Sequence, residues 1–349
     1  MRVLAIETSC DETAVAVVSG HENEIKLEQS YVRSQVDIHE AFGGVVPEVA
    51  AREHLEHILS MLHRAVKSDG EGIDAVAVTA GPGLAPALRV GVETAKALAW
   101  AWKKPLVPVC HLEGHIYATW LNQIKNKKLK IKDENESAIL FPVLALIVSG
   151  GHTELVLMKD HGVYERLGET IDDAAGEAFD KVAKMLGLGY PGGPKVAQLA
   201  ASGNAQSFDF PRALLDRDNF EFSFAGLKTS VLYTLRKNEE LLKDEIFKAN
   251  IAASFQEAVV DVLVKKTMKA AEKYKPTSIV LAGGVAANLA LRDRLKQTCE
   301  QAGIPLHVPE FQFSMDNAAM IGVAGYFRAL RGVSVDPLTL VADPNMDIV

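Results

Sequence analysis

The sequence has few cysteines, no long apolar run and no excess of basic residues. Cys10, Cys110 and Cys299 lie far apart and form no CxxC pair, which indicates a reducing compartment rather than a disulfide framework. No apolar run reaches the roughly 18 residues of a membrane span, and Glu7 interrupts the first apolar stretch, so no signal peptide is visible. We therefore expect a soluble cytoplasmic protein.

Acidic residues outnumber basic ones, and the formal net charge is -8. This balance excludes an indiscriminate nucleic-acid binder, whose surface is basic overall. Any RNA partner must meet a local patch or another subunit. Hydrophobic residues make up 48% of the 349 positions, which argues against disorder and is enough for two domains with cores of their own.

Two histidines four residues apart, His111 and His115, are the strongest chemical signal. On a helix they are separated by about 40° of rotation, so both imidazoles lie on one face and can bind one metal ion. The apolar residues 105–110 predict a buried strand leading into this helix, a junction where α/β proteins bind ligands. Gly114 lowers helix propensity, as expected if another group approaches the backbone closely. The same spacing also fits surface or core histidines without a metal.

Glu113 distinguishes this pair from the metalloprotease motif, in which glutamate directly follows the first histidine. Here the glutamate lies two residues on, about 200° around the helix, where it cannot activate a metal-bound water. A metalloprotease is therefore the weaker interpretation.

Residues 314–317 are predicted to begin a helix. Ser314 suits the N-cap, which places Asp316 in the first turn, where the helix dipole favours a carboxylate. That structural role is sufficient to explain Asp316. The functional alternative makes Asp316 a third ligand beside the two histidines, with open positions on the metal for substrate.

The sequence contains an internal repeat. The strand–turn–strand unit at residues 3–18 resembles the one at 143–158, and the strand and small-residue turn at 75–83 resemble residues 279–285, with Ala80 aligned on Ala282. Two similarities in the same order predict a duplicated α/β domain, with two lobes facing each other across a phosphate-binding cleft. The predicted parts are a first lobe at residues 1–121 completed by a helix at 314–330, a linker at 122–137, a second lobe at 138–313 with an insertion at about 204–242, and a tail at 331–349 without a usable motif.

The two hairpin turns differ in charge. Ser149, Gly150 and Gly151 have no charged side chain, so their backbone N–H groups can approach a phosphate. The first turn instead has Asp11 and Glu12, which are costly near a phosphate unless a cation intervenes or one of them serves as a base. A surface turn with both carboxylates in water is the alternative.

Several further residues of the second lobe and the linker could contact a ligand. Asp180, near the apolar stripe of a helix at residues 172–187, can reach a ribose hydroxyl or form an ordinary helix salt bridge. Gly193 permits close contact with a sugar or base, and Asn288 follows a glycine turn where it can hydrogen-bond a nucleotide. A lysine-rich linker of this kind is usually a solvated loop, but four of its lysines could also attract RNA phosphates: Lys125, Lys127, Lys128 and Lys130.

Many motifs occur in order between residue 1 and about residue 330: ETSCDET, GGVVPE, HLEGH, VSGGHT, IDDAAGEAFDK, YPGGP, FSFAGLKT, GGVAAN and MDNAAM. Together they closely resemble the tRNA N6-adenosine threonylcarbamoyltransferase family, in its bacterial branch. The resemblance implies the duplicated actin, Hsp70 and sugar-kinase (ASKHA) fold, with a nucleotide-binding cleft between the lobes. It also implies one Fe²⁺, or alternatively Zn²⁺, at His111, His115 and Asp316. Implied substrate contacts are Ile147, Val148, Ser149, Gly150, Gly151, Asp180, Gly193 and Asn288.

The resemblance further implies a reaction. The threonylcarbamoyl group passes from threonylcarbamoyl-adenylate to N6 of adenosine 37 in tRNAs that read codons beginning with A, and AMP is released. Asp11 is our candidate for the base that accepts the N6 proton. Implied partners are a degenerate paralogue of the same fold and a small P-loop ATPase, with no membrane.

Two other functions fit the same fold. A sugar or acyl-phosphate kinase would use ATP and Mg²⁺ and would not need the histidine pair. A non-catalytic scaffold paralogue would have lost its metal ligands, whereas His111, His115 and Asp316 are all present.

Overall fold

The computed structural model describes residues 1–21, 24–123 and 138–349, so the linker lysines considered for RNA binding lie outside the described residues. Among the helices of these ranges, none combines the length and apolar character of a membrane span. The chain divides into two compact units: Met1–Ala138 with His161–Val163 and Pro309–Val349, and Ile139–Asp160 with Tyr164–Val308.

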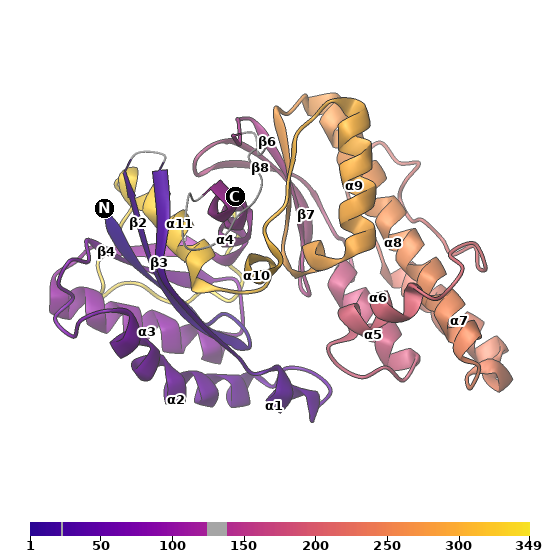
Figure 1. The fold of residues 1–349 in the computed structure, drawn as a ribbon, viewed down its shortest axis with the longest axis horizontal. Coiled ribbons are helices and arrows are strands. Elements are labelled where there is room, and N and C mark those ends of the chain that lie inside the picture. The colour runs from indigo at the N-terminus through magenta and orange to yellow at the C-terminus, as the bar shows by residue number, and fades with distance from the viewer. Residues whose placement is uncertain (22–23, 124–137) are drawn as a thin grey trace. The chain divides into compact units, whose positions relative to one another are not determined.

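The first unit is built on a mixed sheet with the strand order β3-β2-β1-β4-β5 (Figure 1). Its strands are β1 (Arg2–Glu7), β2 (Glu12–His21), β3 (Glu24–Ser34), β4 (Ala75–Gly81) and β5 (Leu106–Cys110). Its helices are α1 (Val36–Glu40), α2 (Pro47–Ala65), α3 (Ala85–Trp102), α4 (His111–Tyr117), the 3-10 helix η1 (Ala118–Gln123), α10 (Phe311–Ser314) and α11 (Ala318–Leu330).

Helices cover both faces of this sheet. Leu4 and Ile6 of β1 pack in one core with buried residues of α2 and α3. Val3 and Ala5 point to the other face, where glycines of α11 approach them. Strands buried on both faces are apolar throughout, which explains why β1 and β4 lack the alternating pattern of a half-exposed strand.

The second unit repeats this design, with the strand order β10-β9-β6-β7-β8. Its strands are β6 (Val143–Val148), β7 (Thr153–Asp160), β8 (Val163–Glu169), β9 (Ser278–Ala282) and β10 (Leu306–His307). Its helices are α5 (Ala175–Met185), α6 (Gly192–Ala200), α7 (Ala225–Lys237), α8 (Glu245–Tyr274) and α9 (Leu289–Ala302), with the 3-10 helices η2 (Glu239–Leu241) and η3 (Gly284–Ala287).

The two sheets confirm the predicted duplication. The central hairpin pairs Val3 with Val18 in the first sheet and Val143 with Met158 in the second. The strands parallel to the hairpins, β4 and β9, correct the sequence alignment by one residue. Val3 pairs with Ala75 on β4, whereas Val143 pairs with Ser278 on β9. In the structure, the residue of the second unit that corresponds to Ala80 is therefore Gly283 and not Ala282. Strands of similar hydrophobicity cannot fix such a one-residue register from sequence.

The segment between α6 and α8 is held to the second unit by a buried lysine. Lys266 of α8 is 1% exposed, and its ammonium donates to the backbone carbonyl and the side-chain oxygen of Asn219, both at 2.9 Å. A buried ammonium is tolerated only with such partners. The predicted insertion at 204–242 contains α7 and η2 in addition to this stretch.

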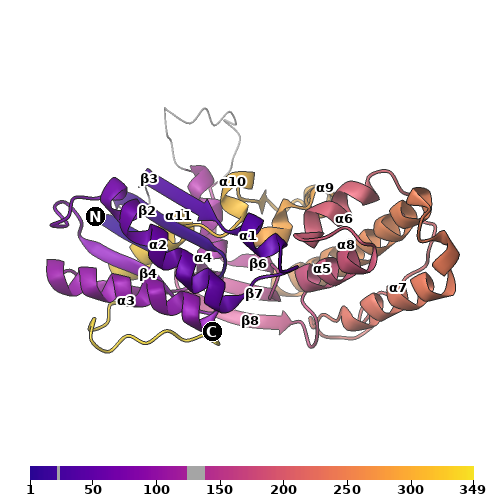
Figure 2. The same ribbon diagram turned by 90° about the horizontal axis from the view of Figure 1, so that it is seen from below.

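The C-terminal tail is an extended segment of the first unit that runs beside α3 (Figure 2). Val335 pairs with Leu106 and thereby covers the edge strand β5. Further on, the Asp343 N–H donates to the Ala80 carbonyl at 2.8 Å, and Leu340 is buried in the core beneath. The tail, for which the sequence alone suggested no role, thus covers the edge of the first sheet.

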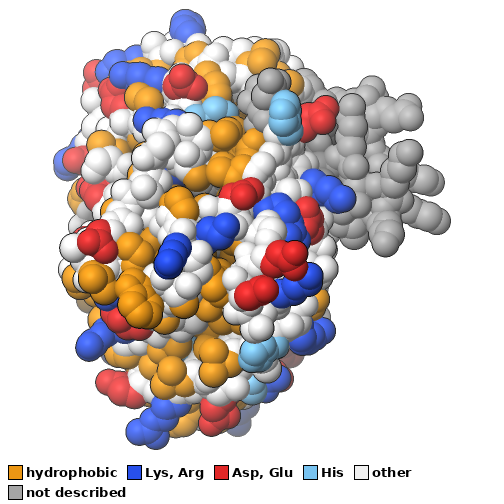
Figure 3. Space-filling view, turned by 90° about the vertical axis from the view of Figure 1, so that its left-hand side faces the viewer, with side chains coloured by type: hydrophobic (Ala, Val, Ile, Leu, Met, Phe, Trp, Pro, Cys, Tyr) orange, Lys and Arg blue, Asp and Glu red, His pale blue; other side chains and the backbone are white. Residues whose placement is uncertain are grey.

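Acidic, basic and hydrophobic side chains are interspersed over the face in Figure 3, as far as described residues form it. This distribution agrees with the small acidic excess of the sequence.

Candidate metal centre and substrate residues

The helix with the histidine pair begins where β5 ends. Cys110 has an extended backbone and serves as the N-cap of α4, so His111 is the first helical residue and His115 follows one turn later. A Cβ on Gly114 would lie 2.7 Å from the side chain of Ile321. The group that approaches the backbone at Gly114 is therefore a side chain of α11.

Asp316 lies in a break between two helices, not in the first turn of one. The expectation that Ser314 caps a helix is wrong: α10 ends at Ser314, and α11 begins at Ala318 with Asn317 as its N-cap. The Asn317 side chain accepts from the Met320 N–H at 2.9 Å and donates to the Met315 carbonyl at 2.7 Å. This arrangement leaves the Asp316 side chain free of capping and turned towards α4.

We expect Asn317→Ala to lower the free energy of unfolding by about 1 kcal/mol, because α11 loses its cap. Asn317→Asp keeps the accepting oxygen and should retain most of that stability. Urea unfolding of both variants checks the prediction, and equal losses in the two would contradict the capping role.

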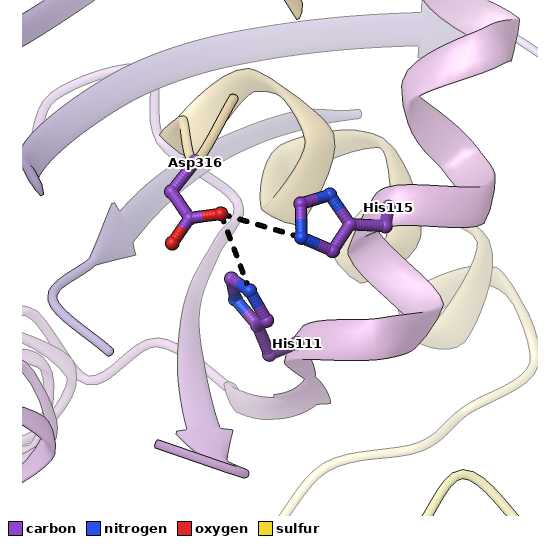
Figure 4. A group of neighbouring side chains, drawn as sticks. All are labelled: His111, His115 and Asp316. Atoms are coloured by element: carbon purple, nitrogen blue, oxygen red, sulfur yellow. Dashed lines mark ion pairs between the residues drawn. The ribbon is translucent and has the colours of Figure 1, made fainter. Parts of the chain in front are cut away.

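The two imidazoles and the carboxylate converge (Figure 4). Nε2 of His111 and Nε2 of His115 each lie 3.3 Å from the same oxygen of Asp316. Candidate ligand atoms of the three residues are all within 4.8 Å of one another. His111 is 8% exposed and His115 is 1% exposed, so the cluster is largely shielded from water.

The cluster attracts positive charge. Burial alone would raise the pKa of Asp316, but His111 and His115 hold it well below its ordinary value. Burial would also lower the pKa of His111, but Asp316 and Glu7 outweigh it and raise that pKa well above its usual range. The pKa of His115 is lowered, first by burial and then by the charge of His111. The carboxylates of Asp316 and Glu7 thus favour a positive charge at this site.

Glu7 belongs to this site, although in the sequence it is only an acidic residue that interrupts an apolar stretch. Its fully buried carboxylate lies 3.1 Å from Nδ1 of His111 and accepts from the hydroxyl of Thr79 and the backbone N–H of Ser9. Nδ1 of His111 faces Glu7, and Nε2 faces Asp316. A carboxylate behind a ligating histidine fixes the ring in this way in metal sites. The available signal was a carboxylate within an apolar strand.

Glu113 points away from the cluster, as the helical geometry predicted. Its carboxylate is 1% exposed and pairs with Arg328 of α11 at 2.8 Å. The pair links α4 to α11, and it places Glu113 outside the ligand set.

We expect Arg328→Ala to destabilise the protein by about 3 kcal/mol, because the buried carboxylate of Glu113 loses the cation beside it. Arg89→Ala, at an exposed position of α3, is the matched control and should cost less than about 0.5 kcal/mol. Denaturant unfolding measures both, and similar losses would show that the pair is not important for stability.

The β1–β2 turn brings more carboxylates into the first unit. Asp11 is 7% exposed and Glu12 is 6% exposed. Burial and the negative charges of Asp316 and Asp11 raise the pKa of Glu12 well above its ordinary value. The candidate base Asp11 thus lies in a largely buried turn that interacts electrostatically with the histidine cluster, not in a solvated surface turn.

The other predicted substrate residues lie in the second unit. Ile147 and Val148 end β6, and the turn that follows has open space around Gly150 and Gly151. The Ser149 carbonyl accepts from the Gly176 N–H at 3.2 Å, which joins this turn to the start of α5.

Asp180 and Asn288 both contact helix starts. Asp180 accepts from the Gly192 N–H at 2.8 Å and also from the Gly193 N–H, and burial raises its pKa. Asn288 caps α9 by accepting from the Leu291 N–H at 3.1 Å, and its amide nitrogen donates to Gln256 at 2.8 Å. The helix salt bridge considered for Asp180 is thus replaced by backbone hydrogen bonds.

Two sheets with the same strand order define a duplicated α/β protein of the actin, Hsp70 and sugar-kinase class. The crystal structure of HypF from T. kodakarensis shares this fold, with a TM-score of 0.61 and 14% identity over 95% of this chain and 48% of that one. The chain thus spans about half of HypF.

The family model of tRNA N6-adenosine threonylcarbamoyltransferase matches residues 26–323. Curated relatives with that name include one from Staphylococcus saprophyticus, 49% identical over 99% of this chain and 96% of its own length. Another, from Thermosipho africanus, is 47% identical over the full length of both chains. The chain therefore belongs to the tRNA N6-adenosine threonylcarbamoyltransferase family. This confirms the resemblance drawn from the motifs.

Proposed function

We propose that the protein transfers the threonylcarbamoyl group from threonylcarbamoyl-adenylate to N6 of adenosine 37 in tRNAs that read codons beginning with A, with release of AMP. The family name supports an acyl transfer to N6 of a tRNA adenosine. The N6 amine is a weak nucleophile because its lone pair is delocalised into the ring, so the donor has to be activated. A mixed anhydride with AMP provides that activation.

The observation that carries the proposal is the convergence of His111, His115 and Asp316. Two imidazole nitrogens and a carboxylate oxygen are a donor set for Fe²⁺ or Zn²⁺, with positions left for substrate. The cluster is shielded from water and favours positive charge. The residues therefore fit one such ion, which when bound supplies a Lewis acid and a template for the donor.

Residues of the first unit would prepare this site for transfer. Glu7 keeps the His111 ring oriented so that Nε2 remains available. Asp11 would accept the proton that N6 loses as the new C–N bond forms and AMP leaves. Because Asp11 is largely buried, little water competes for that proton.

Residues of the second unit would hold the adenylate. The backbone of residues 147–151 offers N–H groups to the phosphate, and the open space at Gly150 and Gly151 permits close approach. Asp180 and Gly193 would contact the ribose, and Asn288 would contact the nucleotide beside the glycine turn.

The acidic character of the chain supports shared recognition of tRNA. With a net charge of -8, it would bind tRNA together with partners, for which we propose a degenerate paralogue of the same fold and a small P-loop ATPase. The unpaired anticodon-loop adenine can be turned out at modest cost. We place the reaction in the cytoplasm.

Reconstitution tests the proposal. The purified chain, both partners, synthetic adenylate and tRNA are incubated, and the nucleosides are analysed by mass spectrometry. We expect threonylcarbamoyladenosine and AMP in equal amounts, and no product from a tRNA with guanosine at position 37. In a separate incubation of the purified chain alone with ATP and Mg²⁺, magnesium-dependent phosphorylation of a small-molecule acceptor would instead indicate a kinase.

A further inference from the structure

Buried polar side chains form a continuous chain beneath the β1–β2 turn, apart from the metal ligands. They are Thr13, Gln35, His39 and His54, and each is at most 1% exposed. Buried polar groups cost free energy unless their donors and acceptors are matched. The direction of every hydrogen bond in this chain can therefore be worked out from its partners.

One end is fixed by the backbone of the GGVVPE motif. The Val46 N–H can only donate, and it lies 3.3 Å from Nδ1 of His39, so the His39 proton is on Nε2. Nε2 of His39 donates to the Gln35 side-chain oxygen at 3.2 Å. The Gln35 amide nitrogen then donates to the Ala50 carbonyl at 3.4 Å and to Nδ1 of His54 at 3.2 Å.

The other end is fixed by a carbonyl of the turn. Nδ1 of His54 also accepts from the Thr13 hydroxyl at 2.7 Å, so the His54 proton is on Nε2. That nitrogen donates to the Cys10 carbonyl at 3.0 Å, and a carbonyl can only accept. The two ends thus require the same proton positions. Burial lowers the pKa of His54, in agreement with the neutral ring that this pattern needs.

The chain holds the backbone on both sides of Asp11. His54 binds the Cys10 carbonyl, and the backbone N–H of Gln35 donates to the Asp11 carbonyl at 3.0 Å. Two successive carbonyls are therefore fixed by groups that are themselves buried and hydrogen-bonded. Little freedom remains for the backbone from which the Asp11 side chain projects.

Such restraint is needed because the carboxyl groups of Asp11 and Glu12 lie close together and Glu12 also interacts with Asp316. The raised pKa of Glu12 reflects burial together with the charges of Asp316 and Asp11. Asp11 is 7% exposed and Glu12 is 6% exposed, and the cost of burying two carboxyl groups favours movement of the turn towards water. We propose that His54 and Gln35 are positioning residues, which hold Asp11 where it accepts the N6 proton. This inference rests on the proposed transfer reaction.

Two substitutions of His54 separate positioning from bulk packing. In His54→Gln the amide nitrogen can take the place of Nε2 and still donate to the Cys10 carbonyl, whereas in His54→Asn it is too short to do so. With the reconstituted complex, we expect kcat to fall about 100-fold in His54→Asn, with the KM for the adenylate unchanged. His54→Gln should stay within about threefold of the wild type, because the bond to the turn survives.

Thr13→Val is the matched control, since it removes one donor to His54 but leaves the Gln35 donor and the bond to Cys10. It should lower the melting temperature while kcat is retained. Gln35→Met provides a second test should His54→Asn not fold. It removes the side-chain bonds to Ala50, His39 and His54 at once and so loosens the residue whose N–H holds the Asp11 carbonyl, and kcat should fall about 10-fold. In an Asp11→Asn background, both losses should disappear, because there is no base left to position.

The outcomes are distinguishable. An active wild type with a full kcat in His54→Asn and Gln35→Met would overturn the positioning role and leave the proposed function intact. Equal losses in His54→Asn and His54→Gln, or losses that persist without Asp11, would show a packing role instead. A wild-type complex that forms no modified nucleoside would refute the transfer reaction and the inference with it.

Discussion

Asp316→Asn is expected to leave the purified protein with less than about a tenth of an equivalent of iron or zinc and to lower the transfer rate at least about 100-fold. The substitution preserves size but removes the negative charge that Asp316 contributes beside His111 and His115. Both Nε2 atoms that lie 3.3 Å from the carboxylate would then face a neutral amide. Removal of a residue that only orients a metal ligand already costs about 10- to 100-fold in metal affinity, so loss of a ligand should cost more.

Elemental analysis and nucleoside mass spectrometry measure the two effects separately. Asp336→Asn removes the same charge from an exposed position in the tail and should change neither. A fully active Asp316→Asn enzyme with one equivalent of metal would show that Asp316 is not a ligand.

Gly325→Val is expected to cost about 3 kcal/mol of unfolding free energy and to weaken metal binding. A Cβ on Gly325 would lie only 2.5 Å from the Cβ of Ala77 on β4, and Gly322 approaches Val18 equally closely. A larger residue must therefore push α11 away from the sheet. Because α11 begins two residues after Asp316, that movement also disturbs the third ligand.

Gly226→Val in α7 is the matched control, because a Cβ there meets nothing within 4 Å. It should change stability by less than about 1 kcal/mol. Chemical denaturation and metal titration compare the two variants. If Gly325→Val were as stable as the control, close packing of α11 on the sheet would not be needed for the site.

The fold could be predicted because its signal is repeated within the chain. Similar strand–turn–strand units at residues 3–18 and 143–158 indicated a duplicated domain, and the two sheets bear this out. The one-residue error at Ala282 arose because buried strands lack the alternation that sets register.

The site was predictable only where its signal is local. The spacing of His111 and His115 placed them on one helical face, and their convergence with Asp316 was expected from the family resemblance. The predicted start of α11 at Ser314 was wrong. Ser314 and Asn317 are both good N-caps, and only tertiary contacts select between them.

Contacts between residues far apart in the sequence leave no local pattern from which they could be predicted. Glu7 is 104 positions from His111, and Arg328 is 215 positions from Glu113. A buried carboxylate can be suspected from an apolar context, but its partner depends on how distant segments pack. The hydrogen-bond chain through Gln35 and His54 was hidden for the same reason.

The central claim is that His111, His115 and Asp316 hold one metal ion. The most direct test is X-ray absorption at the metal edge of the loaded protein, combined with anomalous diffraction from its crystals. We predict a single strong site with two imidazole nitrogens and one carboxylate oxygen at about 2.0–2.2 Å. An ion bound elsewhere in the chain, or an ion without imidazole nitrogen among its ligands, would contradict the account.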